Sequence, residues 1–171
     1  MSTMRAIVFG IFAAWLLSVP AAAQTDADKE RAELAKALVG AKVSLQQGLA
    51  ASERQGRPIS AKFEMEHGQL QLSVYTEKTG KFSEVIVAHQ TGKVAKTEAI
   101  TKSDDLTAAK DQSAAMAKAK RSLRVAVDTT VKANAGFRAV SVFPALKDGH
   151  PVAAVTIVKS QEFRTVTEPL D

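Results

Sequence analysis

One pattern occurs twice in this chain: apolar residues at helical spacing, then a glycine, then alternating strands joined by short turns. Apolar residues three and four apart favour an amphipathic helix, whereas strict alternation favours a strand with one buried face. Because both halves share this order, the sequence predicts an α+β fold of two repeated modules. Each module is expected to pack one helix on a small antiparallel sheet of about three strands.

The first module is expected over residues 24–94. Its helix covers 25–55 and ends at Gly56 and Pro58, since glycine accepts a left-handed cap and proline cannot continue a helix. The residues of its apolar stripe are Leu34, Ala37, Leu38, Ala41, Leu45, Gly48, Leu49 and Ser52. The alternating runs that follow predict strands from Ile59 to Met65, Leu70 to Val74 and Phe82 to Val87.

The second module is expected over residues 103–171, after a linker at 95–102. Its helix begins near Ser103, whose hydroxyl is a suitable cap, and runs with a break to Asn134. Seven stripe residues lie 78 positions after those of the first helix, and they are Ala115, Met116, Ala119, Leu123, Ala126, Val127 and Thr130. The strands are expected at Phe137 to Phe143, Val152 to Val158 and Phe163 to Val166.

The N-terminus has the pattern of a secretory signal peptide over residues 1–23. Arg5 precedes an apolar run, and the three alanines after Pro20 suit cleavage after Ala23. The run is shorter than the roughly 20 residues of a membrane-spanning helix. We therefore expect a periplasmic or secreted protein that keeps no stable membrane span after cleavage.

The composition of the chain argues against several kinds of binding site and partner. The chain has no cysteine, which excludes disulfides and thiolate metal sites. Loss of Arg5 leaves 22 basic and 18 acidic residues, a net charge of +4 with both signs mixed along the chain. Such a distribution argues against nucleic acid as a partner.

The first half ends in Thr91, Gly92, Lys93 and Val94, after the apolar strand that includes Val85. With this order of elements, the chain resembles the PepSY domain family, whose members pair a helix with a small antiparallel sheet and end in a similar motif. The resemblance covers about 34–94 well and 114–166 more loosely. The chain departs from the family pattern at two positions. It has Ala88 where the family often has an aspartate, and Leu70 where the family often has an aromatic residue. The resemblance implies an extracytoplasmic module, found in propeptides of secreted metallopeptidases, without catalytic residues of its own.

Three histidines are the candidate ligands for a soft metal: His67, His89 and His150. No pair of them has the spacing of ligands on one helix or strand, so we expect solvated histidines and no metal site. Whether they converge in space stays open. No serine lies in a glycine elbow, and Glu64 and Glu66 share the outward face of one strand, so we expect neither catalysis nor a cofactor.

One run of charge departs from the mixed pattern, at Lys118, Lys120, Arg121 and Arg124. On a continuous helix it covers the face opposite the apolar stripe and is either a solvated face or an attractor of acidic partners. Three valines lie off the apolar stripes and are either a dimer seam or isolated exposed side chains: Val39, Val43 and Val125.

These observations favour a non-catalytic binding protein of the cell envelope whose partner is a protein or peptide. That partner is either a secreted peptidase, which the protein would restrain, or another envelope protein. The strand with Val85 is expected to be an open sheet edge that pairs with an extended peptide, while Lys118, Arg121 and Arg124 steer the partner. The alternative is a periplasmic binder of a small ligand or metal ion.

Overall fold

The computed structural model describes residues 21–171, so residues 1–20 of the expected signal peptide lie outside the described part. The four helices of that part are α1 (Ala21–Leu38), α2 (Leu45–Ser52), α3 (Ser103–Lys118) and α4 (Leu123–Ala133). Its seven strands are β1 (Arg57–Glu66), β2 (Gln69–Lys78), β3 (Lys81–Val87), β4 (Val94–Ala99), β5 (Arg138–Lys147), β6 (His150–Lys159) and β7 (Glu162–Pro169). None of these helices is long and apolar enough to cross a membrane.

The strands form one continuous antiparallel sheet in the order β4-β3-β2-β1-β5-β6-β7. The expectation of a small sheet in each half is therefore corrected, although the α+β class is confirmed. β1 and β5 join the two halves through two residue pairs, Ala61 with Val142 and Lys62 with Ser141. β4 and β7 are the edge strands of the joined sheet, because β1 and β5 pair with each other.

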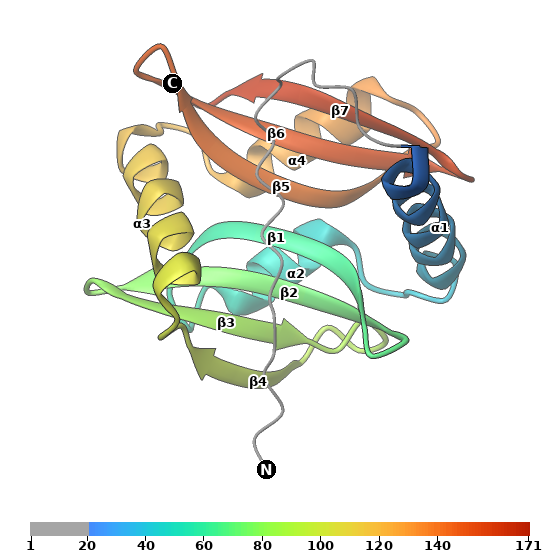
Figure 1. Cartoon of the computed structure of the whole chain (residues 1–171). Coiled ribbons are helices and arrows are strands. Elements are labelled where there is room, and N and C mark those ends of the chain that lie inside the picture. The colour runs from blue at the N-terminus through green and yellow to red at the C-terminus, as the bar shows by residue number, and fades with distance from the viewer. Residues whose placement is uncertain (1–20) are drawn as a thin grey trace.

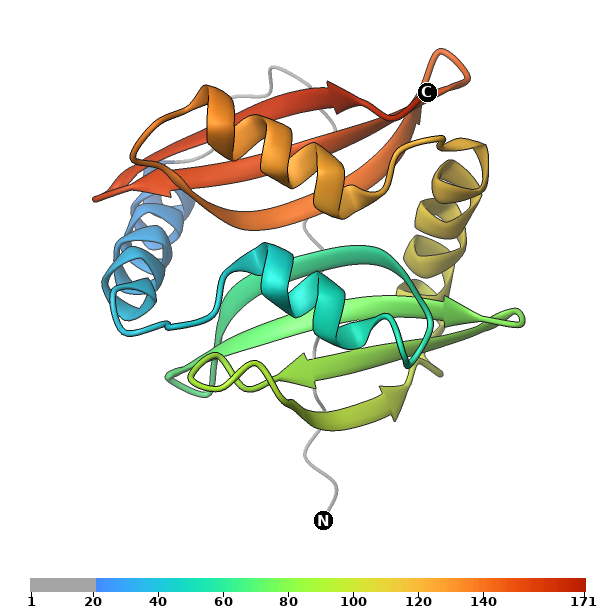
Figure 2. The same cartoon turned by 180° about the vertical axis from the view of Figure 1, so that it is seen from behind.

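The helices lie on both sides of this sheet. α2 and α4 lie side by side behind the strands in Figure 1 and in front of them in Figure 2. α1 and α3 lie on the opposite side, at the two lateral borders of the sheet (Figure 1). α1 contacts β1 and β2, whereas α3 contacts β5, β6 and β1.

The expected first helix is two helices, because residues 39–44 leave the helical path. The backbone N–H groups of Lys42 and Val43 donate to the carbonyl of His89, which fixes this connection against the loop after β3. Ser44 then begins α2 with a capping box, accepting from the N–H of Gln47 and donating its own N–H to the Gln47 side chain. Val43 is buried in this connection, whereas Val39 is 86% exposed.

The expected break in the second helix lies at residues 119–122. The N–H groups of Lys120 and Arg121 donate to the carbonyl of Leu170, and Ser122 caps α4 by accepting from the N–H of Val125. Ser103 does not cap α3, which follows Lys102 without a side-chain cap. The break therefore ties the start of α4 to the C-terminal end of the chain.

Two further expectations are corrected near the strands. The segment 95–102, expected as a linker, contains most of β4, which pairs with β3. Gly56 does not cap a helix, because α2 ends at Ser52. A Cβ atom at Gly56 would lie 2.7 Å from the backbone oxygen of Glu77, so glycine is required there by the close approach of β2.

The parts of the expected apolar stripes that lie on α2 and α4 fill the core between these helices and the sheet, whereas the α1 and α3 parts lie on the opposite side. Leu45, Leu49, Leu123 and Val127 are all buried, as are the residues that face them from the strands. Burial of such side chains is the main source of stability in a chain without disulfides.

Candidate functional site

Two neighbouring rows of residues cross the whole sheet and show that its two faces differ. Cross-strand partners share a face and neighbouring residues along a strand alternate. One row consists of Thr97, Val85, Val74, Ala61, Val142, Val155 and Val166. The other row consists of Lys96, Ile86, Ser73, Lys62, Ser141, Thr156 and Thr165.

The first row belongs to the face against α2 and α4, which we call the covered face. Its five central residues are fully buried. The second row belongs to the face between α1 and α3, which we call the open face. All of its residues except Ser73 are half-buried or exposed. The open face is therefore more accessible than the covered face for contact with another molecule.

α3 covers one border of the open face. The hydroxyl of Ser60 on β1 donates to the side-chain oxygen of Gln112 on α3 at 2.7 Å, in a buried position. Tyr75, which pairs with Ser60, is buried beside it. These contacts hold α3 at a fixed place along the border of the open face.

The β1–β2–β3 half of the open face carries a connected polar network. Lys62 Nζ lies 2.6 Å from a carboxylate oxygen of Glu64, and the Ser73 hydroxyl donates to the other oxygen at 2.9 Å. The amide of Gln71 donates to Ser73 at 2.9 Å and to Glu84 at 3.4 Å. Lys62 also lies over the ring of Tyr75, 5.9 Å from its centroid. Each member is thus positioned by at least one other.

Burial raises the pKa of three groups in or near this network: Glu84, Asp105 and Tyr75. It raises the pKa of Glu84, an effect that a hydrogen bond with Ser73 partly opposes and the charge of Glu64 increases. Burial likewise raises the pKa of Asp105 on α3. The pKa of the Tyr75 phenol is raised far above its usual range by burial and by the neighbouring carboxylates, so Tyr75 stays neutral.

The β5–β6–β7 half of the open face is different in chemistry. The charged residue Arg138 at the start of β5 donates to the carbonyls of Leu38 and Val43. Between Arg138 and the β5–β6 turn the open-face positions are uncharged and mostly small or apolar, and they include Ser141, Phe143, Ala145, Val152, Ala154, Thr156, Thr165 and Thr167. Ala145, Thr165 and Thr167 are exposed, and the other five are half-buried. The open face therefore places an uncharged surface directly beside a charged one.

The charged half is acidic. Three basic side chains, Arg57, Lys62 and Lys96, share it with five carboxylates, those of Glu64, Glu66, Glu77, Glu84 and Glu98. The whole chain, by contrast, carries a net charge of +5. A basic group on a partner would be attracted to this half and repelled by much of the remaining surface.

The structure separates the residues of the expected basic face. Lys118 lies at the end of α3, Arg121 in the break and Arg124 on α4. Arg121 donates to the carbonyl of Pro169 and to the hydroxyl of Thr129, and Lys118 lies 3.5 Å from the carbonyl of Gly149. Arg124 lies 4.0 Å from Glu53 on α2. These side chains connect elements of the fold instead of forming one helix face.

Val85 does not lie on an open edge. β3 is paired on both sides, with β2 and with β4, and Val85 is fully buried. The expectation that this strand accepts a peptide by backbone pairing is therefore wrong. The physical reason is that residues 94–99 already occupy the position beside it.

The three histidines do not converge. His67 and His150 are exposed at two turns and pair with Glu66 and Asp171, respectively. His89 contributes its backbone carbonyl to the α1–α2 connection. Within residues 21–171 no group of three or more histidine or acidic side chains has the geometry of a metal site.

Thr91, Gly92, Lys93 and Val94 form the tight connection from β3 to β4. The N–H groups of Thr91 and Gly92 both donate to the carbonyl of Ala88, and Gly92 has a positive φ of 75°. Gly92 lies against Val43 of the α1–α2 connection. This motif has a structural role here, since it supports the chain between α1 and α2.

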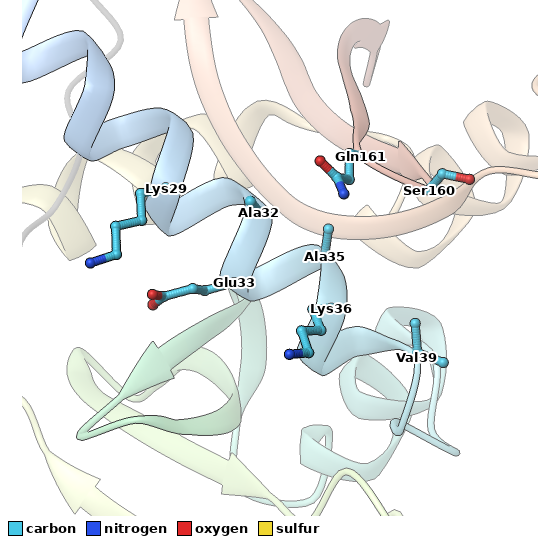
Figure 3. A pocket seen from close by; sticks show the side chains of 8 residues that line it. All are labelled: Lys29, Ala32, Glu33, Ala35, Lys36, Val39, Ser160 and Gln161. Carbon is cyan, nitrogen blue, oxygen red and sulfur yellow. The ribbon is translucent and has the colours of Figure 1, made fainter.

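An open pocket of about 460 Å³ lies between α1 and the β6–β7 turn. Figure 3 shows its lining side chains, from Lys29 to Val39 on the side of α1 and Ser160 and Gln161 from the turn. Ala32, Ala35 and Val39 give it an apolar wall. The polar groups that line it do not form a network like the one on the open face.

Sequence reasoning placed Lys62, Glu64 and Glu66 on an outward face but did not identify the network. The available signal was the coincidence of polar residues on three successive strands, where Ser73 and Glu84 also interrupt apolar runs. No protein-family model, curated protein or solved structure matches this chain. The open face is thus the feature on which a functional hypothesis has to rest.

Proposed function

We propose that the two halves are tandem copies of one PepSY-like module. Ser44 and Ser122, 78 positions apart, each accept a hydrogen bond from the N–H three residues later and begin α2 and α4. β1 and β5 each carry a β-bulge just before Ser60 and Ser141, 81 positions apart. Matching caps and matching bulges at nearly constant spacing support a duplication, because bulges are rarely placed by chance.

We propose that the protein is an exported, non-catalytic binding protein that binds another protein or peptide of the cell envelope through the open face. The observation that carries this proposal is the difference between the two rows that cross the sheet. A sheet of seven strands with one face left half-exposed, and with aliphatic groups next to fixed charges, is typical of an interaction surface.

The chemistry of the open face defines the complementary partner. Phe143, Ala154 and Val152 offer apolar contact, whereas Glu64 and Glu84 favour a basic group. The partner surface should therefore present an apolar patch beside a lysine or arginine. The resemblance to PepSY modules places secreted peptidases first among the partners to be tested.

The test is chemical cross-linking and affinity capture from a periplasmic extract. Ala145→Glu places a charge on the uncharged half at an exposed position, so it should reduce capture at least tenfold without affecting the melting temperature. Lys132→Glu, on the exposed side of α4, is the matched control and should leave capture unchanged. Equal capture by both variants would exclude the open face as the binding surface.

A second candidate function is the binding of a small apolar ligand. The pocket between α1 and the β6–β7 turn favours it, because Ala32, Ala35 and Val39 give an apolar wall. Binding of a fluorescent apolar probe that is abolished by Ala35→Asp would support this candidate. In that case Ala145→Glu should have no effect on the probe.

A further inference from the structure

The two edges of the sheet are not equivalent. β3 and β7 are each the third strand of their half, but β3 is covered by β4 whereas β7 pairs only with β6. Within residues 21–171 nothing occupies the position beside β7 that β4 occupies beside β3. An uncovered strand of eight residues presents a row of backbone N–H and C=O groups that favours pairing with another strand.

The chemistry of the two edge strands also differs. On β4 the alternate residues Lys96 and Glu98 form an ion pair of 2.8 Å on the open face, a common device that disfavours further pairing. On the open face β7 presents Thr165 and Thr167, both uncharged and exposed. Its charged residues lie at covered-face positions, where Arg164 pairs with Glu162 and Glu168 accepts a hydrogen bond from Thr130. A further strand should therefore pair more favourably with β7 than with β4.

The sequence of β7 is complementary to itself when two copies run antiparallel around Val166. In that register Val166 lies opposite Val166 of a second copy, and Thr165 lies opposite Thr167. Arg164 then lies opposite Glu168, twice, since a two-fold axis repeats each contact. Opposite charges and threonine pairs are favourable cross-strand neighbours.

Neighbouring registers lack this match. A shift that centres the pairing on Thr165 places Glu162 opposite Glu168 and Arg164 opposite Val166. The one register between these two places open-face residues against covered-face residues, because the side-chain period of a strand is two. The charge pattern therefore selects one register.

The helix behind β7 supports the same arrangement. Arg121 donates both to Pro169 at the end of β7 and to Thr129, so Thr129 lies on the side of α4 next to this edge. Val125 lies one turn before Thr129 and is 42% exposed. Two strands paired at β7 would bring the Val125 side of α4 toward its copy, much as α2 and α4 contact each other across the β1–β5 pairing.

We propose that the protein forms a symmetric homodimer by antiparallel pairing of β7 with β7 of a second copy, centred on Val166. The dimer extends the sheet to fourteen strands and makes the two open faces continuous. This inference uses a different surface from the proposed binding function and does not depend on it.

Complementary charge reversal tests the register. Arg164→Glu and Glu168→Arg each place like charges opposite each other in a homodimer, so each variant alone should sediment as a monomer. A mixture of the two should sediment as a heterodimer, because both cross-strand pairs are then of opposite charge. Restored association in the mixture also shows that both variants fold. Dimers of either single variant as stable as those of the wild type would overturn the proposal.

A single cysteine gives an independent test, since the chain has none of its own. Val166→Cys should form an intermolecular disulfide under mild oxidation, because residue 166 faces itself across the two-fold axis. Thr97→Cys, in the same row on β4, is the matched control and should stay reduced. A wild type that is monomeric throughout, with Val166→Cys no more cross-linked than Thr97→Cys, would overturn the proposal. The same result is expected if another protein occupies β7.

Discussion

The hydroxyl of Ser73 donates a hydrogen bond of 2.9 Å to Glu64 at the middle of the open face. Ser73 also accepts from Gln71, which in turn reaches Glu84 at 3.4 Å, so two carboxylates share one small polar network. Lys62 compensates Glu64 directly, at 2.6 Å. Burial raises the pKa of Glu84, and the charges of Glu64 and Glu98 raise it further, whereas the hydrogen bond with Ser73 and the charge of Lys62 oppose this only in part. An ionised Glu84 therefore opposes folding.

The stability of the protein should depend on pH through Glu84. Its pKa is higher in the folded chain than in the unfolded chain, so folding takes up a proton between the two values and the free energy of unfolding falls as pH rises through them. Glu84→Gln should raise the melting temperature at pH 7 and have much less effect at pH 3.5, below the usual carboxylate pKa. Thermal unfolding at both values of pH measures this.

Glu53→Gln is the control for this prediction, since Glu53 is exposed on the far side of the molecule. It should leave the melting temperature nearly unchanged at either pH. An increase for Glu84→Gln that is equal at both values of pH would show that the effect comes from packing and not from the buried charge.

Gly56 should be intolerant of a side chain. A Cβ atom there would lie 2.7 Å from the backbone oxygen of Glu77, which can move only if β2 moves. Overpacking of this kind costs about 1–3 kcal/mol, so Gly56→Ala should lower the free energy of unfolding measured in urea by that amount. At Gly40 the nearest atom is at 3.5 Å, and Gly40→Ala should cost clearly less.

The local elements could largely be predicted from the sequence. Alternation of apolar residues located six of the seven strands, and the turn residues followed from their chemistry. His67 and Asp148 each precede a glycine, and all four residues of these two turns have positive φ. The buried side of α2 and of α4 was also predicted correctly, because helical spacing reports which side faces a core.

The breaks and the way the halves join could not be predicted so easily. Ser44 and Ser122 are suitable caps that were visible in the sequence, but an uninterrupted apolar stripe concealed the breaks before them. β4 lacks a strong apolar alternation, since it forms an exposed edge. The pairing of Ala61 with Val142 joins the modules through only two residue pairs, and no periodicity in one sequence reports such a contact.

The two halves should depend equally on their helix cores. Leu45 at the start of α2 and Leu123 at the start of α4 are both buried, and truncation of a buried leucine costs about 2–5 kcal/mol. Leu45→Ala and Leu123→Ala should each clearly lower the melting temperature, whereas the exposed Lys42→Ala and Lys120→Ala should not. If Leu123→Ala behaves like Lys120→Ala, the second half does not pack as described.

Export has an optical signature that needs no partner or ligand. Trp15 is the one tryptophan of the chain and lies in the expected signal peptide, so cleavage after Ala23 removes it. Protein purified from the periplasm should then emit only from Tyr75, and its N-terminal sequence should begin with Gln24. Unprocessed protein made without export provides the reference spectrum with tryptophan emission. Tryptophan emission from the periplasmic material would contradict cleavage at this position.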